Sequence, residues 1–248
     1  KRSKGKRKCG VTTVRFVQYP DGRKGLIPRI LMGLLKSRKD TKKKMDAEPD
    51  EFKKRLYDGL QLAYKVTANS VYGQIGARTS KMYKPQIAAS TTAGGRGRIT
   101  HARDFVLRNY PNSEIVYGDT DSCYFSAWPI LRKEVEEGRM QWNYETCIAL
   151  YDSIADQVNQ SFPGFMEQAF HCPREMGSVI KGGREVVASK GLFITKKRYA
   201  VMIIDKEGKR VDVEGKPGKV KAMGLDLKRS DTPKVIQDFL SELLHDVL

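Results

Sequence analysis

The stretch Ile115–Phe125, IVYGDTDSCYF, contains two short runs of β-branched and aromatic residues around a Gly-Asp-Thr-Asp segment. Strand-forming residues separated by such a segment predict a β-hairpin. Asp119 and Asp121 lie at positions i and i+2, so in a strand-like backbone both carboxylates face one side. Paired carboxylate oxygens suit a hard divalent cation such as Mg²⁺. An acidic turn that caps its own backbone is the alternative, and the pair alone does not decide between them.

Upstream of this hairpin the apolar residues have helical spacing. Residues 27–45 are predicted to form one helix, and the stripe from Phe52 to about Ala68 a second, which ends before Gly73 and Gly76. The connection between them, around residues 46–50, is short. Two helices of this length joined in this way must lie antiparallel, which predicts a helical hairpin.

Basic residues recur on the predicted hairpin. Arg38 and Lys42 share one face of the first helix, and Lys65 and Asn69 share one face of the second, because each pair is four residues apart. If these faces converge, three cations and one amide are available to a polyphosphate. A solvated basic face remains the alternative for each cation.

Outside the two predicted hairpins the pattern indicates further helices and strands. Helices are expected over 99–107 and 143–162 and from Thr232 to the end, and strands over 185–188, 191–194 and 198–204; residues 1–24 are expected to be irregular. The predicted fold class is therefore α+β, an antiparallel sheet with a long antiparallel helical hairpin. The run Lys196-Lys197-Arg198-Tyr199 opens one strand and combines cations with an aromatic residue, which favours contact with backbone phosphates. A basic edge strand that resists aggregation explains it equally well.

Composition narrows the class of partner. The chain has 248 residues with 46 Lys and Arg against 29 Asp and Glu, so its formal net charge is +17. Such an excess attracts polyanions, nucleic acid first and an anionic membrane surface second. No apolar run approaches the ~20 residues of a membrane span, so no membrane-spanning helix is expected. With nucleic acid preferred over a membrane surface, no membrane is expected among the partners. The four cysteines lack CxxC spacing, which indicates neither a disulfide framework nor a zinc ribbon.

Several of these segments together resemble family B DNA polymerases. KVTANSVYG at 65–73 has the K-x-x-x-N-S-x-Y-G form of that family's fingers helix, and YGDTDS at 117–122 the form of its palm carboxylate hairpin. GLIPRILMGLLKSRKDTK at 25–42 resembles the first fingers helix, KKRY at 196–199 a primer-template contact, and KAMGLDLKRSDTP at 221–233 the thumb entry. The thumb entry and Gly183–Val186 look most like the replicative polymerases of T-even-type bacteriophages and related viruses.

The resemblance implies a metal-dependent nucleotidyl transfer. Asp121 is then a direct ligand of two Mg²⁺ ions, Asp119 has a lesser or outer-shell role, and Glu185 is the family's third acidic residue near the metals. Phosphoryl transfer needs little covalent help, so metals and fixed cations supply most of the catalysis. The implied reaction transfers deoxynucleotides from dNTPs to a primer 3′ end under the direction of a template.

The remaining site residues follow from the same resemblance. The incoming triphosphate is expected to contact Arg38, Lys42, Lys65 and Asn69, with Tyr72 and Gly73 lining the nascent base pair. Primer-template DNA is expected to contact Lys196, Lys197, Arg198 and Tyr199. A non-catalytic, basic nucleic-acid-binding module is the alternative function, in which the carboxylates are structural.

The resemblance also implies a domain plan. Residues 1–25 form a basic lead-in or palm remnant, 26–72 the fingers hairpin, 73–220 the palm and 221–248 the start of the thumb, within an incomplete right-hand architecture. The family's upstream palm strand, D-x-x-S-L-Y-P, and its exonuclease domain have no counterpart in the sequence. We therefore expect a fragment that is inactive by itself. A second polypeptide carrying the absent parts and a sliding clamp are candidate partners, and the host cytoplasm, or the nucleus of a eukaryotic host, is the expected location.

Overall fold

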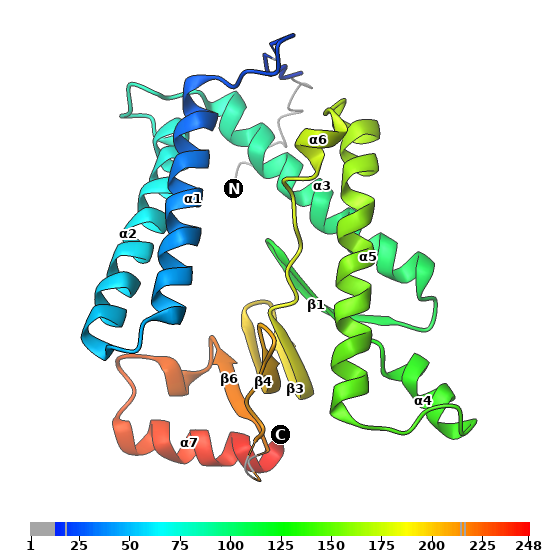
Figure 1. Cartoon of the computed structure of the whole chain (residues 1–248). Coiled ribbons are helices and arrows are strands. Elements are labelled where there is room, and N and C mark those ends of the chain that lie inside the picture. The colour runs from blue at the N-terminus through cyan, green and yellow to red at the C-terminus, as the bar shows by residue number, and fades with distance from the viewer. Residues whose placement is uncertain (1–12, 18, 214, 216) are drawn as a thin grey trace, which may run out of the picture. The chain divides into compact units, whose positions relative to one another are not determined.

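The computed structural model describes residues 13–17, 19–213, 215 and 217–248 (Figure 1). The chain divides into two compact units, Lys1–Gly94 and Gly95–Leu248. The division falls inside helix α3, Pro85–Asn109, and not at any of the three domain boundaries expected from the sequence, which stay predictions. Within residues 1–24, which were expected to be irregular, residues 1–12 and 18 lie outside the described residues, and residues 13–17 form neither helix nor strand.

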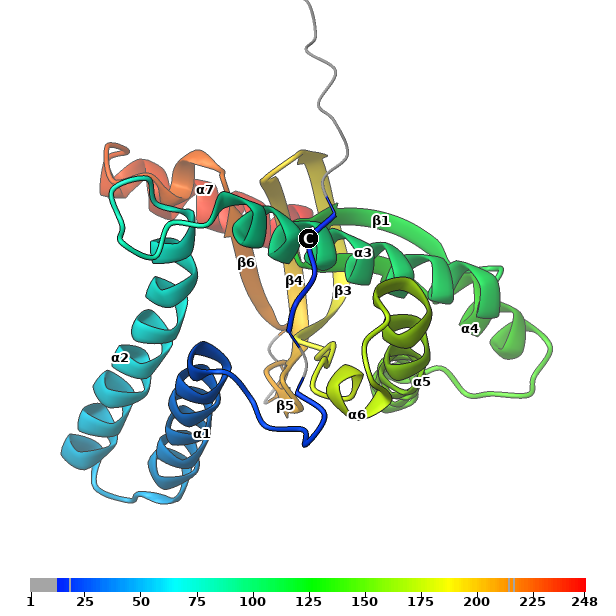
Figure 2. The same ribbon diagram turned by 90° about the horizontal axis from the view of Figure 1, so that it is seen from above.

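The first unit contains the predicted helical hairpin. Helix α1 spans Leu26–Ala47 and α2 spans Glu51–Gly76, and the two pack antiparallel (Figure 2). Asp50 begins α2 because its carboxylate accepts hydrogen bonds from the amides of Phe52 and Lys53, at 2.8 and 3.0 Å. The sequence therefore predicts this hairpin correctly.

Helix α2 is longer than predicted. It continues through Gly73 and ends at Gly76, although both glycines were expected to stop it. A glycine inside a helix costs only about 1 kcal/mol relative to alanine. The less exposed face of α2 also continues past Ala68 through Val71 and Ile75, so packing outweighs that cost.

The apolar stripe of α1 is wider than its contact with α2. Ile27, Leu31 and Leu34 are partly buried, whereas Leu26 and Ile30 are 66% and 48% exposed. A single partner helix covers only part of an apolar face. The apolar stripe therefore predicts the helix correctly but overestimates how many of its apolar side chains are buried within this unit.

The second unit contains two antiparallel sheets. Strands β1 (Glu114–Asp119) and β2 (Ser122–Ser126) form the predicted hairpin. The other sheet consists of β3 (Val186–Thr195), β4 (Arg198–Lys206), β5 (Lys209–Arg210) and β6 (Lys219–Met223), with β4 paired to all three others. The two strands expected within 185–194 are one continuous, bulged strand, and β6 was not predicted. This mixture of helices and antiparallel sheets confirms the α+β class.

Helices surround these sheets. They are α3, α4 (Trp128–Glu136), α5 (Tyr144–Phe170), α6 (Arg174–Gly177), a 3₁₀ turn (Asp226–Lys228) and α7 (Lys234–Val247). Helices α3 and α5 extend beyond their predicted limits, and α5 continues through Pro163 because Phe162 and Met166 are both buried around it. No helix in the described part of the chain is long and apolar enough to cross a membrane.

Strand β4 is the centre of the second unit, and both of its faces are covered. Tyr199, Val201 and Ile203 pack on the face that carries Tyr117 and Tyr124 of the β1–β2 hairpin. On the opposite face Ala200 and Met202 pack with residues of β6, of α7 and of the position that follows α7, which are Val220, Ala222, Leu244 and Leu248. Because side chains alternate along β4, the sheet has two distinct faces. We call the face of Tyr199, Val201 and Ile203 the hairpin face, and the face of Ala200 and Met202 the α7 face.

Candidate functional site

The two aspartates of the hairpin lie in different local structures. Asp119 is the last residue of β1 and pairs with Ser122, whereas Thr120 and Asp121 form the turn. The amide of Asp121 donates to the Asp119 carbonyl at 2.6 Å, and Thr120 has φ +50°. A β-branched residue with positive φ is rare. The strand-based reason for a shared side therefore does not apply, because this turn sets the direction of Asp121.

The surroundings of the two carboxylates also differ. The Asp119 side chain is only 17% exposed; its carboxylate accepts from the Thr120 hydroxyl at 3.1 Å and lies 3.9 Å from Nζ of Lys197. Asp121 is exposed. One carboxylate is thus held by neighbouring groups, and the other is open to an incoming ligand.

This donor set suits Mg²⁺, which proteins bind through one or two carboxylates while substrate phosphates and water complete the octahedron. Among the residues that the structure describes, no three His, Cys, Asp or Glu side chains are grouped so as to hold a metal. Any ion bound by the Asp119–Asp121 turn would therefore take its other ligands from outside this group. Those positions are available to phosphate oxygens.

Four aromatic rings, two from the hairpin and two from the sheet below it, fix the orientation of the hairpin. Tyr117, Tyr124, Phe193 and Tyr199 have ring centroids 5.2 to 6.0 Å apart. The Tyr124 and Tyr199 hydroxyls lie 3.3 Å apart, and burial with that hydrogen bond raises the pKa of Tyr199 to about 12. Tyr199 is 4% exposed, so its burial does not support the predicted contact with DNA. It supports the hairpin instead.

The turn between β3 and β4 presents the predicted cations. Lys196, Lys197 and Arg198 are all exposed, and Lys197 has φ +63°. This uncommon conformation is held from two sides. The Lys197 amide donates to the Tyr117 hydroxyl at 2.7 Å, and Gly224, with φ +64°, approaches the Lys197 carbonyl so closely that a Cβ there would overlap it.

Glu185 does not join the two aspartates. It is exposed and precedes the first residue of β3, where its carbonyl accepts from the Glu207 amide at 2.9 Å. Asp119, in contrast, lies beside Lys197, which follows the last residue of β3. The two acidic positions are therefore at opposite ends of this strand, and a metal-proximal role for Glu185 stays a prediction.

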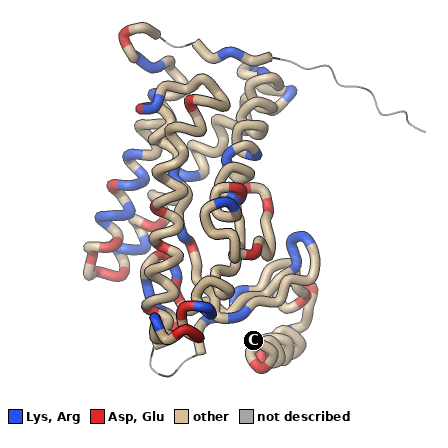
Figure 3. Tube along the Cα trace, turned by 90° about the vertical axis from the view of Figure 1, so that its right-hand side faces the viewer, with Lys and Arg blue, Asp and Glu red and all other residues tan. Residues whose placement is uncertain are grey.

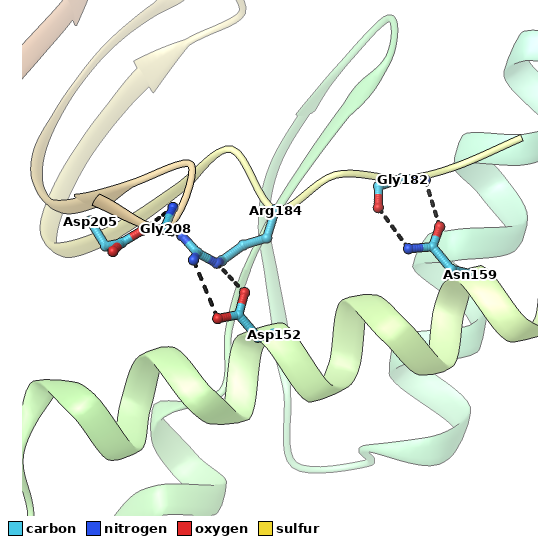
Figure 4. A network of polar contacts seen from close by, with 6 residues as sticks. All are labelled: Asp152, Asn159, Gly182, Arg184, Asp205 and Gly208. Carbon is cyan, nitrogen blue, oxygen red and sulfur yellow. Dashed lines mark hydrogen bonds and ion pairs between the residues drawn. The ribbon is translucent and has the colours of Figure 1, made fainter. Parts of the chain in front are cut away.

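A polar network next to Glu185 was not apparent from the sequence. Arg184 is 10% exposed and pairs with Asp152 of α5, at 2.5 Å, and with Asp205 of β4 (Figure 4). The backbone of Gly182, two residues before Arg184, exchanges two hydrogen bonds with the side chain of Asn159 of α5, at 2.7 and 3.0 Å. Together these contacts attach the segment before β3 to α5. Its partners are distant in sequence, so no local pattern reveals it.

In the first unit, the structure arranges the predicted triphosphate residues as a row. The Arg38 guanidinium donates to the Gln61 side chain at 3.2 Å, across the two helices. Lys65 lies one turn beyond Gln61 on α2, and Lys42 one turn beyond Arg38 on α1, each about 5.4 Å along its axis. Because the helices are antiparallel, Lys42 and Lys65 extend in opposite directions from this contact. Gln61 was not predicted to link the two helices.

The other predicted residues of α2 continue this arrangement. Asn69, Tyr72 and Gly73 follow Lys65 by four, seven and eight residues, which places all of them on one helix face. Lys65 and Asn69 are exposed, and Tyr72 is 42% exposed. Basic residues are spread over both units and interspersed with acidic ones (Figure 3). The ordered row on the α1–α2 hairpin is therefore more informative than the total charge.

Comparison with known proteins gives the family. The model of DNA polymerase family B matches residues 3–248. The chain is 45% identical to the DNA polymerase of Phaeocystis pouchetii virus over 64% of its residues, 28% identical to that of Pyramimonas orientalis virus over 94%, and 30% identical to the bovine DNA polymerase delta catalytic subunit over 97%. It spans 16%, 21% and 20% of these relatives, about a fifth of their length. The narrower resemblance to T-even-type phages stays a prediction. The chain belongs to DNA polymerase family B.

Proposed function

We propose that this chain takes part in template-directed DNA synthesis, in which a deoxynucleotide is transferred from a dNTP to the 3′ end of a primer. The observation that carries the proposal is the Asp119–Asp121 turn. In this turn the Asp119 carboxylate is fixed by neighbouring groups and the Asp121 carboxylate is exposed. The Tyr117 hydroxyl accepts a hydrogen bond from the Lys197 amide and so connects the hairpin to the exposed Lys196–Arg198 turn. In the proposal the two carboxylates bind a cation, and the neighbouring basic turn binds phosphate.

In this proposal Asp119 and Asp121 hold Mg²⁺, and two ions act together as the family resemblance implies. When bound, the metal supplies Lewis-acid stabilisation to the oxygens that gain negative charge. Thr120 and Lys197 keep the Asp119 carboxylate in place, because one donates a hydrogen bond to it and the other provides a positive charge. Asp121 is free to bind the ion directly.

The α1–α2 hairpin has the second part in the proposal. The row formed by Lys42, Arg38, Lys65 and Asn69 binds the triphosphate of the incoming dNTP, and Tyr72 with Gly73 lines the nascent base pair. Fixed cations around developing negative charge account for much of phosphoryl transfer. A right-hand arrangement of fingers, palm and thumb entry is part of the same proposal.

The test is Asp121→Asn in a DNA polymerase that carries this chain, with Asp156→Asn on the exposed side of α5 as the matched control. The amide keeps the size of the side chain and removes the charge that a metal needs. We expect Asp121→Asn to abolish primer extension and leave duplex binding largely intact, while Asp156→Asn changes neither. Near-normal extension by Asp121→Asn would refute the proposed role of Asp121 in catalysis. Duplex binding by the chain that does not respond to Mg²⁺ or nucleotide would then favour a non-catalytic nucleic-acid-binding module with structural carboxylates.

A further inference from the structure

Strand β6, which the sequence did not predict, places two lysines on one face of the sheet. Its register with β4 sets Lys221 opposite Val201 and Lys219 opposite Ile203. Directly opposed residues of an antiparallel pair project from the same face. Val201 and Ile203 belong to the hairpin face, so Lys219 and Lys221 lie on the face that carries the Asp119–Asp121 turn.

The alternating residues of β6 confirm this orientation. Val220 and Ala222 pack with Met202 and with residues of α7, on the opposite face of the sheet. The hairpin tyrosines pack against Phe193 of β3 and Tyr199 of β4. Strand β6 pairs with β4 on its other side from β3. Its lysines therefore lie beside the hairpin and not beneath it.

Both lysines are available to a ligand. Lys219 is exposed and Lys221 is half-buried. Within the described ranges, neither ammonium has a carboxylate at ion-pair distance, in contrast to Lys197 with Asp119. Lys221 lies opposite the buried Val201, and an apolar stem beside such a residue with a charged end group suits a phosphate contact.

The same surface continues into the Lys196–Arg198 turn. Strand β6 ends at Met223, opposite Tyr199, and the next residue, Gly224, lies against the Lys197 carbonyl. Lys219 and Lys221 are two residues apart on a strand, about 6.6 Å. Neighbouring phosphates on one strand of B-DNA rise ~3.4 Å along the axis but lie farther apart in space, because the backbone also winds around that axis, so the lysine spacing is comparable to one phosphate step.

We propose that Lys219 and Lys221 extend the surface of the Lys196–Arg198 turn and bind backbone phosphates of duplex DNA. The identity of the polyanion rests on the proposed polymerase function. A strand that carries lysines only to prevent aggregation is the competing explanation, and it requires no ligand. The two explanations differ in how DNA binding depends on salt.

The experiment measures binding of the full 248-residue chain to a fluorescein-labelled primer-template duplex by anisotropy, from 50 to 300 mM KCl. Each phosphate neutralised contributes about −0.9 to the slope of log Kobs against log salt concentration. We expect the Lys219→Gln/Lys221→Gln double variant to lose about 1.8 from the magnitude of this slope. Lys190→Gln is the matched control, because Lys190 is exposed and pairs with Met202 on the α7 face of the same sheet.

An unchanged slope in the double variant would overturn the inference, and so would a loss of about 0.9 from the single variant Lys190→Gln, since an equal loss per charge would mean that only total charge matters. Equal intrinsic fluorescence of the variants and the parent chain establishes that they are folded. Failure here leaves the Asp121→Asn test of synthesis untouched, because that test measures primer extension. Conversely, unaffected primer extension by Asp121→Asn would reject the proposed metal-binding role of Asp121 without removing a salt-dependent DNA contact on β6.

Discussion

Gly224 should be among the least replaceable residues of the second unit. It has φ +64°, a conformation that costs an L-residue about 1–2 kcal/mol. A Cβ at this position would also overlap the backbone carbonyl oxygen of Lys197, which no side-chain rotation can relieve. The perturbation we choose is Gly224→Ala, the smallest change that adds a Cβ.

The cost can be divided with a matched control. Gly138, after α4, has φ +69° and no atom within 4 Å of a Cβ, so Gly138→Ala carries only the conformational term of about 1–2 kcal/mol. Gly224→Ala adds a forced backbone shift of about 1–3 kcal/mol. We expect a total of about 2–5 kcal/mol. At about 2–4 °C per kcal/mol, a midrange value lowers Tm by roughly 10 °C.

Tryptophan fluorescence during thermal or urea unfolding is the appropriate assay. The chain has two tryptophans, Trp128 and Trp142, and both belong to the second unit, so the signal reports the unit that contains Gly224. Because the displaced carbonyl is that of Lys197, Gly224→Ala should also weaken duplex binding, and Gly138→Ala should not.

Equal destabilisation by Gly224→Ala and Gly138→Ala would refute this reasoning. It would mean that the Lys197 carbonyl moves aside at no cost, and that the turn is not held from this side. A large loss of stability with unchanged duplex affinity would retain the packing argument and reject the link between Gly224 and the DNA-binding turn.

Two further predictions concern buried polar groups. Arg184→Gln removes the charged partner of Asp205, whose side chain is 3% exposed. This variant should destabilise the second unit by about 3–5 kcal/mol in urea unfolding, whereas Arg174→Gln, which breaks an exposed ion pair, should not. Equal effects of the two variants would contradict a buried ion pair at Arg184. Burial and nearby Arg108 lower the pKa of His101 below its ordinary 6.5, so the fold favours the neutral ring. Its stability contribution is present above pH 6.5 and lost as the pH falls through the lowered value, so His101→Phe should flatten the dependence of Tm on pH between 7.5 and 5.

Local patterns account for much of this fold. The periodicity of α1 and α2, with the Asp50 cap between them, predicts the helical hairpin, and the runs around Gly118–Asp121 predict the β-hairpin. Element ends were less predictable. Helix α2 continues past Gly73, and α5 past Pro163, because apolar contacts on both sides of each residue outweigh its local cost of about 1–3 kcal/mol. The sequence shows that local cost but not the tertiary contacts that outweigh it.

The sequence by itself determined the family, the acidic turn at Asp119–Asp121 and the basic run at Lys196–Arg198, since each depends on adjacent residues. Only the tertiary structure decided that Tyr117 joins the two, that Glu185 lies at the far end of β3 from Asp119, and that Lys219 and Lys221 face the hairpin side. These facts depend on strand register and on partners distant in the chain. A shift of one residue in β6 would turn both lysines to the opposite face, and no local pattern in the sequence specifies that register.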